Sequence, residues 1–362
     1  YDVIVTTYGT VRRDASHLKD VQYDYVILDE AQAIKNSNCQ SAKACRLLTA
    51  HHRLAMTGTP IENQLGDIWS IMDFLNPGML GKLPAFKRLA GGATSDPASL
   101  EQIRQAMAPF ILRRTKEEVL PDLPEKTEQT LLVDLSPPQR KRYNQVRDYY
   151  RAHLSGKIEE IGLQKAKMHV LEALLRTRQI ACDPRLIDKK SNVVGAKLEC
   201  LMEQLQTVVN EGSKALVFSQ FTSLLSLVKP ELDRKNIVFE YLDGKTRKRG
   251  ERVERFQEDP NVPVFLISLK AGGHGLNLTA ADYVFILDPW WNPATEAQAI
   301  DRAHRIGQTK PVMAYRLIAR DTIEEKIVAL QNDKRELADS IITGTSSLMQ
   351  SLTAEDLVQL FS

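Results

Sequence analysis

The sequence predicts an α/β fold with parallel sheets divided over two domains, and three observations predict it. The chain has 362 residues, more than one domain usually contains. Apolar runs rich in Val, Ile and Leu recur and alternate with helical stretches, which is typical of parallel sheets covered on both faces. These runs fall into two groups, one in residues 1–60 and one in residues 213–290.

In the first group, we expect strands in "DVIVTTY" (residues 2–8), "YVILDE" (25–30) and "HRLAMTGTP" (52–60). Residues 64–114 are expected to be helical and irregular. The first residue is Tyr1 and not methionine, and the chain begins inside an expected core strand. We therefore expect it to be a fragment of a longer protein.

In the second half, residues 120–139 are rich in proline and are expected to form a linker that ends in an extended segment. Residues 137–182 show helical periodicity, with Ser136 as a capping residue and proline in the first turn. Four further strands are expected, in "KALVFSQF" (214–221), "IVFEYLDG" (237–244), "VPVFLISL" (262–269) and "DYVFILDP" (282–289).

The composition excludes several classes of protein. The hydrophobic content of 43% is sufficient for real cores, and no apolar run reaches the length of a membrane span. The four cysteines are scattered without a C-x-x-C pair, which indicates reduced intracellular thiols and not a disulfide framework or a zinc site: Cys39, Cys45, Cys182 and Cys200. Because the net charge is only +2, nucleic-acid binding would require local basic patches.

Two carboxylates, Asp29 and Glu30, stand at the end of an expected strand. An aspartate there can hold Mg²⁺, usually through water, and a neighbouring glutamate can orient or deprotonate an attacking water. At the end of the next run, Thr57, Gly58 and Thr59 offer hydroxyls and a tight turn. Each motif has a simpler alternative, a solvated acidic loop or an ordinary turn after a strand, but together they indicate a nucleotide site.

Residues 292–308 predict a helix that begins with Asn292 as cap and Pro293 in its first turn. Gln298, Arg302 and Arg305 would share one face of that helix. Guanidinium groups stabilise the charge of a transferring phosphoryl group. The alternative is a solvated basic helix face.

The segment "SLKAGGHGLNLTAAD" (268–282) places Gly272, Gly273 and Gly275 after a strand, where their backbone N–H groups can cradle phosphate. "DGKT" (243–246) is not a phosphate-binding loop, because Phe239 stands where such a loop needs glycine. Two basic stretches, 139–151 and 244–256, are either surfaces that follow a phosphate backbone or solvated helix faces.

Seven segments in order resemble the helicase motifs of the Swi/Snf-type DNA translocases, a superfamily-two group of helicase-like ATPases. They are "VIVTTYGTV", "ILDEAQAIKN", "RLAMTGTPIENQLGDIWSIMDFLNPGMLG", "LVFSQF", "VFLISLKAGGHGLNLTAAD", "DPWWNPATEAQAIDRAHRIGQ" and "YRLIARDTIEEKI". "LRRTKEEVLPDLPEK" and "RQIACDP" resemble the segments between these motifs. The overall style is similar to that of compact bacterial or archaeal members.

The resemblance implies two RecA-like lobes with inserted helical protrusions, the first lobe truncated at its N-terminus. It implies four regions: residues 1–125 for the rest of lobe one with a protrusion at 64–114, 126–190 for a linker and the protrusion of lobe two, 191–321 for the core of lobe two, and 322–362 for a brace helix and tail.

The resemblance also implies roles for single residues. Asp29 would serve Mg²⁺ and Glu30 the attacking water, Gln32 would couple them to the nucleotide state, and Arg302 and Arg305 would be arginine fingers. The other nucleotide-binding residues would be Thr57, Thr59, Gly272, Gly273, Gly275 and Gln298. The DNA-binding residues would be Thr6, Thr7, Tyr8, Ser219, Gln220, Gly244, Lys245, Thr246, Ser268, Lys270, Trp291 and Asn292, with Asp243 and Trp290 beside them.

The implied function is an ATP-dependent translocase on double-stranded DNA that remodels protein–DNA complexes as a monomeric motor, with ATP and Mg²⁺ between the lobes. The family's phosphate loop is not found in the 362 residues, so we expect this chain alone to hydrolyse ATP poorly or not at all. Two alternatives stay open, a non-catalytic DNA-binding scaffold and an RNA helicase. We expect a cytoplasmic, nucleoid-associated location if the organism is bacterial or archaeal and a nuclear location if it is eukaryotic, and we expect no membrane.

Overall fold

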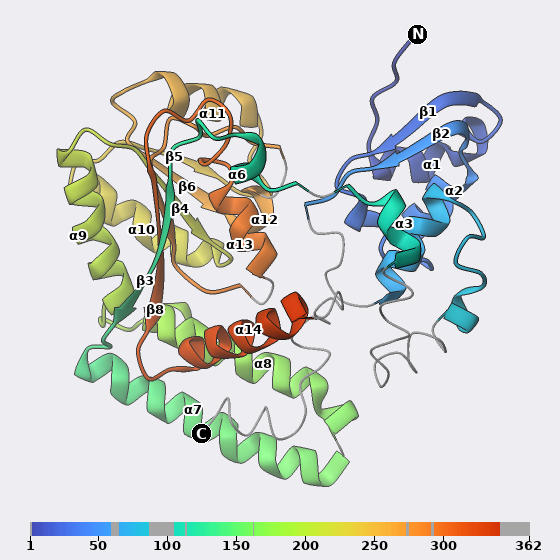
Figure 1. The fold of residues 1–362 in the computed structure, drawn as a ribbon. Coiled ribbons are helices and arrows are strands. Elements are labelled where there is room, and N and C mark those ends of the chain that lie inside the picture. The colour runs from blue at the N-terminus through green and yellow to red at the C-terminus, as the bar shows by residue number, and fades with distance from the viewer. Residues whose placement is uncertain are drawn as a thin grey trace. The chain divides into compact units, whose positions relative to one another are not determined.

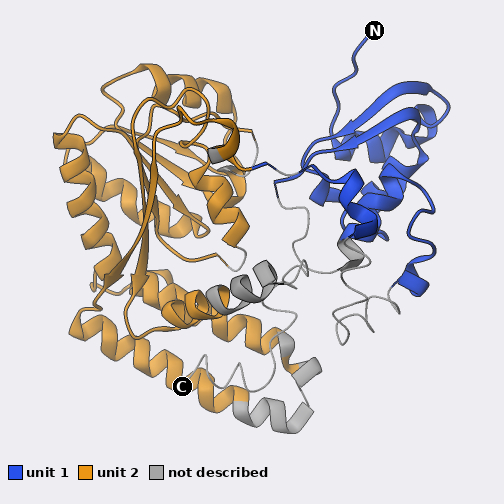
Figure 2. Cartoon of the chain, viewed as in Figure 1, with its two compact units in different colours: residues 1–114, 333–351 blue, residues 115–332, 352–362 orange. Residues whose placement is uncertain are grey.

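The computed structural model describes residues 2–58, 65–86, 105–112, 114–161, 163–272, 275–290 and 293–340. The chain divides into two compact units (Figure 2). Unit 1 consists of residues 1–114 and 333–351, and unit 2 of residues 115–332 and 352–362.

Unit 1 is a small α/β unit built around two parallel strands, which confirms two of the three strands expected there. Strands β1 and β2 pair in parallel, with Leu28 opposite Ala55. Helices pack on this sheet through apolar side chains that include Val11, Ile34 and Phe74. The elements are α1 (Tyr8–Leu18), β1 (Gln22–Leu28), η1 (Ala31–Ile34), α2 (Gln40–Leu47), β2 (Thr49–Ala55), α3 (Leu65–Leu75) and η2 (Ala108–Phe110).

The strand expected over residues 2–8 is wrong. Residues 2–7 have no regular structure, and α1 begins at Tyr8. The hydroxyl of Thr7 accepts a hydrogen bond from the backbone N–H of Thr10 at 3.2 Å and caps this helix. Val3 and Val5 are 77% and 92% exposed. A β-branched run forms a strand only where neighbouring strands and a packed face support it, and these valines have neither in unit 1.

Unit 2 contains a six-stranded, all-parallel sheet (Figure 1). The strand order is β3-β8-β7-β4-β6-β5. The expected strands at 214–221, 237–244, 262–269 and 282–289 are confirmed as β4, β5, β6 and β7, and the extended end of the proline-rich linker is β3. The strands are β3 (Lys126–Val133), β4 (Ala215–Ser219), β5 (Phe239–Leu242), β6 (Val264–Ser268), β7 (Tyr283–Ile286) and β8 (Val312–Ala319).

The sheet of unit 2 is covered on both faces, which explains why its strands are apolar without alternation. Val217 and its neighbours on one face pack against α9 and α10. Leu216 and Phe218 pack on the other face, in one cluster with Phe256 of α11 and Ile300 at the end of α13. The covering helices are α9 (Ala196–Asn210), α10 (Thr222–Arg234), α11 (Arg249–Glu258) and α13 (Pro293–Ile300), with the short α12 (Leu269–Gly272) after β6.

The expected helical region between the two strand groups is confirmed. Helix α7 (Pro137–Ile161) and helix α8 (Leu163–Cys182) pack together. Gln139 of α7 donates to the carbonyls of Ile180 and Ala181 at the end of α8. Unit 2 also contains α6 (Lys116–Val119), η3 (Pro184–Leu186) and the start of α14 (Ile323–Ser340), which lies where a final helix was expected.

Among the residues that the structure describes, no helix has both the length and the apolar character needed to cross a membrane. All four cysteines are free thiols, in agreement with the expectation from their spacing.

Candidate nucleotide and DNA sites

The structure brings the predicted acidic motif and the predicted threonine turn of unit 1 together. Gln32 Nε2 donates to Glu30 Oε2 at 2.6 Å, and Thr57 Oγ1 donates to Gln32 Oε1 at 2.7 Å. The two segments also share a backbone hydrogen bond of 2.9 Å from the N–H of Ala31 to the carbonyl of Met56. Gln32 therefore connects a carboxylate after β1 to a hydroxyl after β2.

Glu30 has an unusual backbone, with φ +50° and ψ +52° in the left-handed region. Residues other than glycine rarely adopt this region, and those that do are often found at functional sites. Its N–H donates to Asp29 Oδ1 at 2.9 Å, which turns the chain sharply after β1. Asp29 is exposed and Glu30 is half-buried, so both carboxylates are available to a ligand.

Tyr8 is the predicted DNA-binding residue that lies next to this acidic motif. Its hydroxyl donates to the backbone carbonyl of Asp29 at 2.7 Å. Burial, and then the nearby Cys45 and the two carboxylates, raise the pKa of Tyr8 well above its ordinary value, so it stays a hydrogen-bond donor. Thr6 and Thr7 precede it on an exposed segment, and the Thr7 hydroxyl is used as the helix cap.

In unit 2, the glycine-rich segment and the two predicted arginine fingers are neighbours. Arg305 Nη1 donates to the carbonyl of Leu276 at 3.2 Å, and the N–H of Leu278 donates to the carbonyl of Arg302 at 3.0 Å. Gly275 has a φ of +60°, which favours glycine. The guanidinium group of Arg305 and the backbone of Arg302 therefore lie beside the glycine-rich segment.

The continuous helix expected over residues 292–308 is wrong, because α13 ends at Ile300. The N–H of Arg302 donates to the carbonyl of Ala299, three residues back, and residues 301–307 form turns. Arg302 and Arg305 are thus presented by a turn beside the glycine segment, and only Gln298 lies on the helix.

Helix α6 holds this arginine turn in place. Lys116 Nζ forms an ion pair with Asp301 at 2.6 Å and donates to the carbonyl of His304 at 2.8 Å. The ring Nε2 of His304 lies 2.7 Å from the carbonyl of Pro124. These contacts fix the backbone on either side of Arg302, and no sequence pattern predicted them.

The predicted DNA-binding residues of unit 2 lie at one edge of the sheet. Because β7, β4, β6 and β5 are adjacent and parallel, their carboxyl ends lie side by side. The segments that follow these strands contain Trp290, Gln220, Lys270 and Lys245 respectively. This is the edge where ligands bind in open parallel sheets.

The turn after β5 is organised around Asp243. Its carboxylate accepts hydrogen bonds from the N–H of Lys245 at 2.9 Å, from the Thr246 hydroxyl at 2.9 Å and from the Tyr241 hydroxyl at 3.0 Å. Burial raises the pKa of Asp243, but these hydrogen bonds together outweigh it and hold the pKa below its ordinary value. The turn leaves Gly244 and Lys245 exposed, so the backbone N–H groups and the lysine remain available for phosphate.

Two of the predicted DNA-binding residues have buried side chains. The Ser219 hydroxyl donates to the carboxylate of Asp288, and Ser219 is fully buried. Ser268 is 4% exposed, and its hydroxyl accepts from the N–H of Ala271 in α12. These serines shape the turns, whereas the exposed Lys270 can reach a ligand directly.

Part of the basic stretch at 244–256 is neutralised internally. Arg252 and Arg255 of α11 both form ion pairs with Glu240, which is 1% exposed, at 2.7 and 2.8 Å. Lys248 forms an ion pair with Glu251. Of the two interpretations of residues 244–256, the solvated helix face therefore fits this part of α11, because its basic residues are paired with carboxylates.

Comparison with known proteins identifies the family. The family model of the SNF2-related domain matches residues 1–186, and the model of the helicase conserved C-terminal domain matches residues 196–307. The chain belongs to the SNF2-related family. The predicted resemblance and fold class are thereby confirmed.

Solved structures of this family share the fold. The SWI2/SNF2 ATPase core of Sulfolobus solfataricus in complex with dsDNA is 36% identical, with a TM-score of 0.56 over 99% of this chain and 77% of that chain. The SWI2/SNF2 ATPase core domain of the same organism gives a TM-score of 0.54 at 36% identity, over 99% of this chain and 75% of that chain. The parallel sheets described above are those of a SWI2/SNF2 RecA-like ATPase core.

Curated relatives are longer proteins. The putative ATP-dependent helicase/translocase YwqA of Bacillus subtilis is 38% identical over 100% of this chain and 40% of its own length. The TATA-binding protein-associated factor MOT1 of Saccharomyces cerevisiae is 33% identical over 99% of this chain and 22% of its own length. The chain thus spans between about a fifth and two fifths of these SNF2-related relatives.

Four predicted site residues of this SNF2-related chain lie outside the described residues: Thr59, Gly273, Trp291 and Asn292. Gly272 ends α12, and Gln298 is half-buried on α13. Within the described ranges, no group of three or more His, Cys, Asp or Glu side chains could hold a metal ion. The single exposed carboxylate of Asp29 still fits Mg²⁺, which uses one or two carboxylates and otherwise binds water and substrate phosphates.

Unit 2 contains a buried polar network that was not predicted from the sequence. Arg178 is 2% exposed and pairs with the fully buried Asp288 at 3.7 Å. Lys197 is 1% exposed and pairs with the fully buried Glu324. The available signal was a charged residue inside an otherwise apolar pattern, such as Asp288 directly after "FIL".

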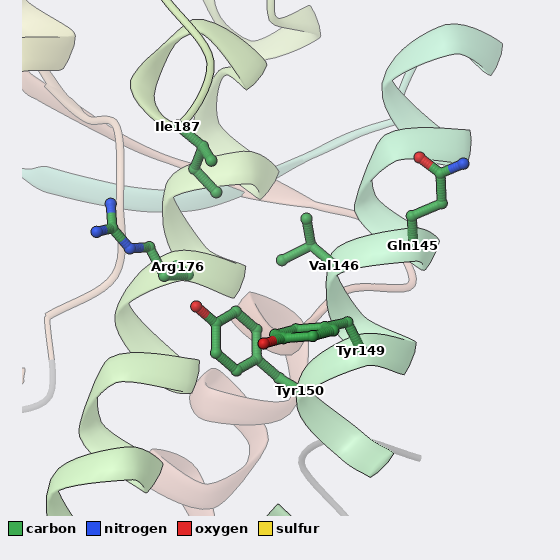
Figure 3. A pocket seen from close by; sticks show the side chains of 6 residues that line it. All are labelled: Gln145, Val146, Tyr149, Tyr150, Arg176 and Ile187. Carbon is green, nitrogen blue, oxygen red and sulfur yellow. The ribbon is translucent and has the colours of Figure 1, made fainter. Parts of the chain in front are cut away.

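A hollow of about 260 Å³ lies between α7 and α8 (Figure 3). Side chains from both helices point toward it, and Ile187 adds an apolar wall. It is lined by Gln145, Val146, Tyr149, Tyr150, Arg176 and Ile187, none of which belongs to the predicted sites.

Proposed function

We propose that this protein is an ATP-dependent motor that moves along double-stranded DNA and remodels protein–DNA complexes. One observation carries the proposal. Two separate clusters contain groups that phosphoryl transfer needs. In unit 1, Gln32 joins the carboxylate of Glu30 to the hydroxyl of Thr57, and in unit 2 the guanidinium of Arg305 lies beside the glycine-rich segment.

In the first cluster, Asp29 would hold Mg²⁺, and the metal would neutralise charge on the nucleotide phosphates. Glu30 is positioned to orient a water molecule, because the amide of Gln32 fixes its Oε2 atom. The same amide accepts from Thr57, so a movement of either segment would reach the other through Gln32. This is the coupling role proposed for Gln32.

In the second cluster, Arg302 and Arg305 would place positive charge on the phosphate oxygens as negative charge develops there. Their turn is fixed by the bonds to Leu276 and Leu278. The glycine segment would add backbone N–H groups, and Gln298 would support them from α13.

The DNA backbone would bind along the carboxyl edge of the sheet of unit 2. Lys245 and Lys270 provide exposed charge there, and Gln220 and Thr246 provide hydrogen-bonding groups. Contacts of this type go to phosphates and do not read sequence. Thr6, Thr7 and Tyr8 would make the corresponding contacts in unit 1.

The activity test uses the full-length protein. Glu30→Gln should keep nucleotide binding and abolish turnover, and Arg305→Ala should reduce turnover by roughly 10³–10⁵-fold, the usual worth of an arginine finger. Matched controls are Asp24→Asn on β1 and Arg234→Ala on α10, which remove exposed charges away from both clusters. Normal turnover in Glu30→Gln or Arg305→Ala would refute the assignment.

The DNA test uses affinity as a function of salt. Lys245→Gln should weaken duplex binding equally for unrelated sequences and lower the salt slope by about one unit, as expected for one lost phosphate contact. If the full-length protein binds duplex DNA but its ATP turnover does not respond to it, a non-catalytic scaffold is favoured. Stimulation by RNA and not by duplex DNA would favour an RNA helicase.

A further inference from the structure

Four consecutive residues after β7, residues 287–290, are held by side chains from different helices of unit 2. We call them the β7 exit. Lys197 of α9 donates from Nζ to the carbonyl of Leu287 at 2.8 Å. Arg178 of α8 donates from Nη2 to the carbonyl of Pro289 and pairs with the carboxylate of Asp288.

Trp290, the last residue of the β7 exit, is held at both ends of its backbone. Its N–H donates to Glu296 Oε1 of α13 at 2.6 Å, and its carbonyl accepts from Gln331 Nε2 of α14. Glu296 is 1% exposed and is also paired with Arg316 of β8 at 2.7 Å. Four helices and a strand thus contribute to the position of this short segment.

Arg178 also reaches a second segment. Residues 219–221 comprise the last residue of β4 and the two that follow it, and we call them the β4 exit. The Nη1 atom of Arg178 donates to Gln220 Oε1 at 3.4 Å, and its guanidinium lies 5.7 Å from the ring centre of Phe221. Asp288 accepts from the Ser219 hydroxyl, so the arginine–aspartate pair connects both exits.

The burial of this pair indicates a role other than stability. Arg178 is 2% exposed and Asp288 is fully buried. A buried ion pair is often no more stabilising than well-packed apolar residues, because both charges must leave water. Apolar residues cannot form directed hydrogen bonds. The planar guanidinium of an arginine can, and it can bond to the β4 exit and the β7 exit at the same time.

The orientation of Gln220 follows from the same contact. Its oxygen faces Arg178, so its amide nitrogen points the other way. That nitrogen is buried and has no hydrogen-bond acceptor among the described residues. A donor aimed in this way is suited to an acceptor such as a phosphate oxygen supplied by a ligand.

We propose that Arg178 is a positioning residue that locks the β4 exit and the β7 exit together, so that Gln220 and Trp290 meet the DNA backbone as one rigid surface. The DNA part of this inference rests on the proposed function. The locking part concerns the protein alone, and it can be measured without DNA.

The experiment uses the 362-residue chain with Trp69→Phe, which leaves Trp290 and Trp291 as the fluorescent reporters. The main variant is Arg178→Met with Asp288→Asn, because removing both charges avoids an unpaired buried carboxylate. The second variant, Arg178→Lys, keeps the charge but loses the planar fork. The matched control is Arg185→Met with Asp183→Asn, another arginine–aspartate pair of unit 2 with a fully buried aspartate, 2.7 Å apart.

In both Arg178 variants, acrylamide quenching of tryptophan should rise about two-fold while far-UV circular dichroism stays unchanged. Duplex affinity should fall about ten-fold, which is the worth of roughly one charge-assisted hydrogen bond, with an unchanged salt slope because no exposed lysine is lost. The control should lose thermal stability and keep the parent's quenching and affinity.

Parent-like quenching in both Arg178 variants would overturn the inference, as would an equal rise in the control. If the main variant fails to fold, Arg178→Lys decides alone. If the Trp69→Phe parent itself does not bind duplex DNA, the proposed function fails, and the quenching comparison still decides whether Arg178 locks the two exits.

Discussion

The buried ion pair of Lys197 with Glu324 in unit 2 allows a quantitative test of how the charge of a buried carboxylate is balanced. Glu324 is fully buried and accepts from Lys197 Nζ, from the Cys182 thiol at 3.3 Å and from the N–H of Ala319 at 3.0 Å. Lys197→Met removes the cation and keeps the length of the side chain. The carboxylate of Glu324 is then left without its counter-charge inside the protein.

The expected cost of Lys197→Met is about 3–5 kcal/mol in the free energy of unfolding of unit 2, the usual cost of breaking a buried pair. Lys197→Met combined with Glu324→Gln should recover roughly 1–3 kcal/mol of this, because the glutamine oxygen still accepts from Ala319 without carrying a charge. The bond from Lys197 to Leu287 is lost in both variants and cancels in the comparison.

The measurement is urea unfolding followed by tryptophan fluorescence in the Trp69→Phe background, which reports on unit 2. Lys214→Met is the matched control, since the Nζ of Lys214 donates to the carbonyls of Phe256 and Asp259 and forms no ion pair with a fully buried carboxylate among the described residues. Its loss should cost about 1–2 kcal/mol, the range for ordinary hydrogen bonds. An unchanged m-value would show that the midpoint reports stability.

The reasoning is refuted if Lys197→Met costs no more than the Lys214 control. It is also refuted if the double variant is as unstable as the single one, because the carboxylate would then not be the source of the cost.

Three further predictions concern other parts of unit 2. Gly195→Ala should lower stability by about 1–3 kcal/mol in thermal unfolding, because its new Cβ would lie 2.5 Å from the carbonyl of Cys182. Tyr143→Phe should cost about 1–3 kcal/mol, because the buried N–H of Ile323 donates to the Tyr143 hydroxyl at 2.7 Å and would lose its acceptor. Asp243 has a folded pKa below its ordinary value of 3.8, so its stabilising contribution is present above that pH and is lost as the pH falls further. Asp243→Asn should therefore flatten the acid limb of the stability curve, and an unchanged limb would contradict this.

The strands that the sequence predicted well are those of the central sheet of unit 2. Helices cover both faces of this sheet, so Leu216, Val217 and Phe218 are all fully buried. A strand buried on both faces needs a continuous apolar run, and such a run can be recognised in the sequence. The run from Val3 to Val5 has the same composition but no covering layer in unit 1, and it is not a strand. Composition alone does not distinguish these two environments.

The candidate site residues were easier to predict from the sequence than the residues that hold them in place. Asp29, Glu30 and Gln32 are close in sequence, and short-range geometry brings them together. Helix α13 ends at Ile300, and the next residue, Asp301, pairs with Lys116, a contact over 185 residues that periodicity does not encode. The network around Arg178 was missed for the same reason.

The pairing of β3 with β8 has a consequence for synthesis on the ribosome. Strand β8 lies between β3 and β7, and it is the last strand of unit 2 in the sequence, whereas β3 is the first. All eight residues from Lys126 to Val133 pair with β8. During translation β3 emerges early and has no hydrogen-bonding neighbour until residues 312–319 have left the exit tunnel. The nascent chain must therefore keep an unmatched edge segment in solution while nearly two hundred residues are added, and it is during this interval that a chaperone would have the most to protect.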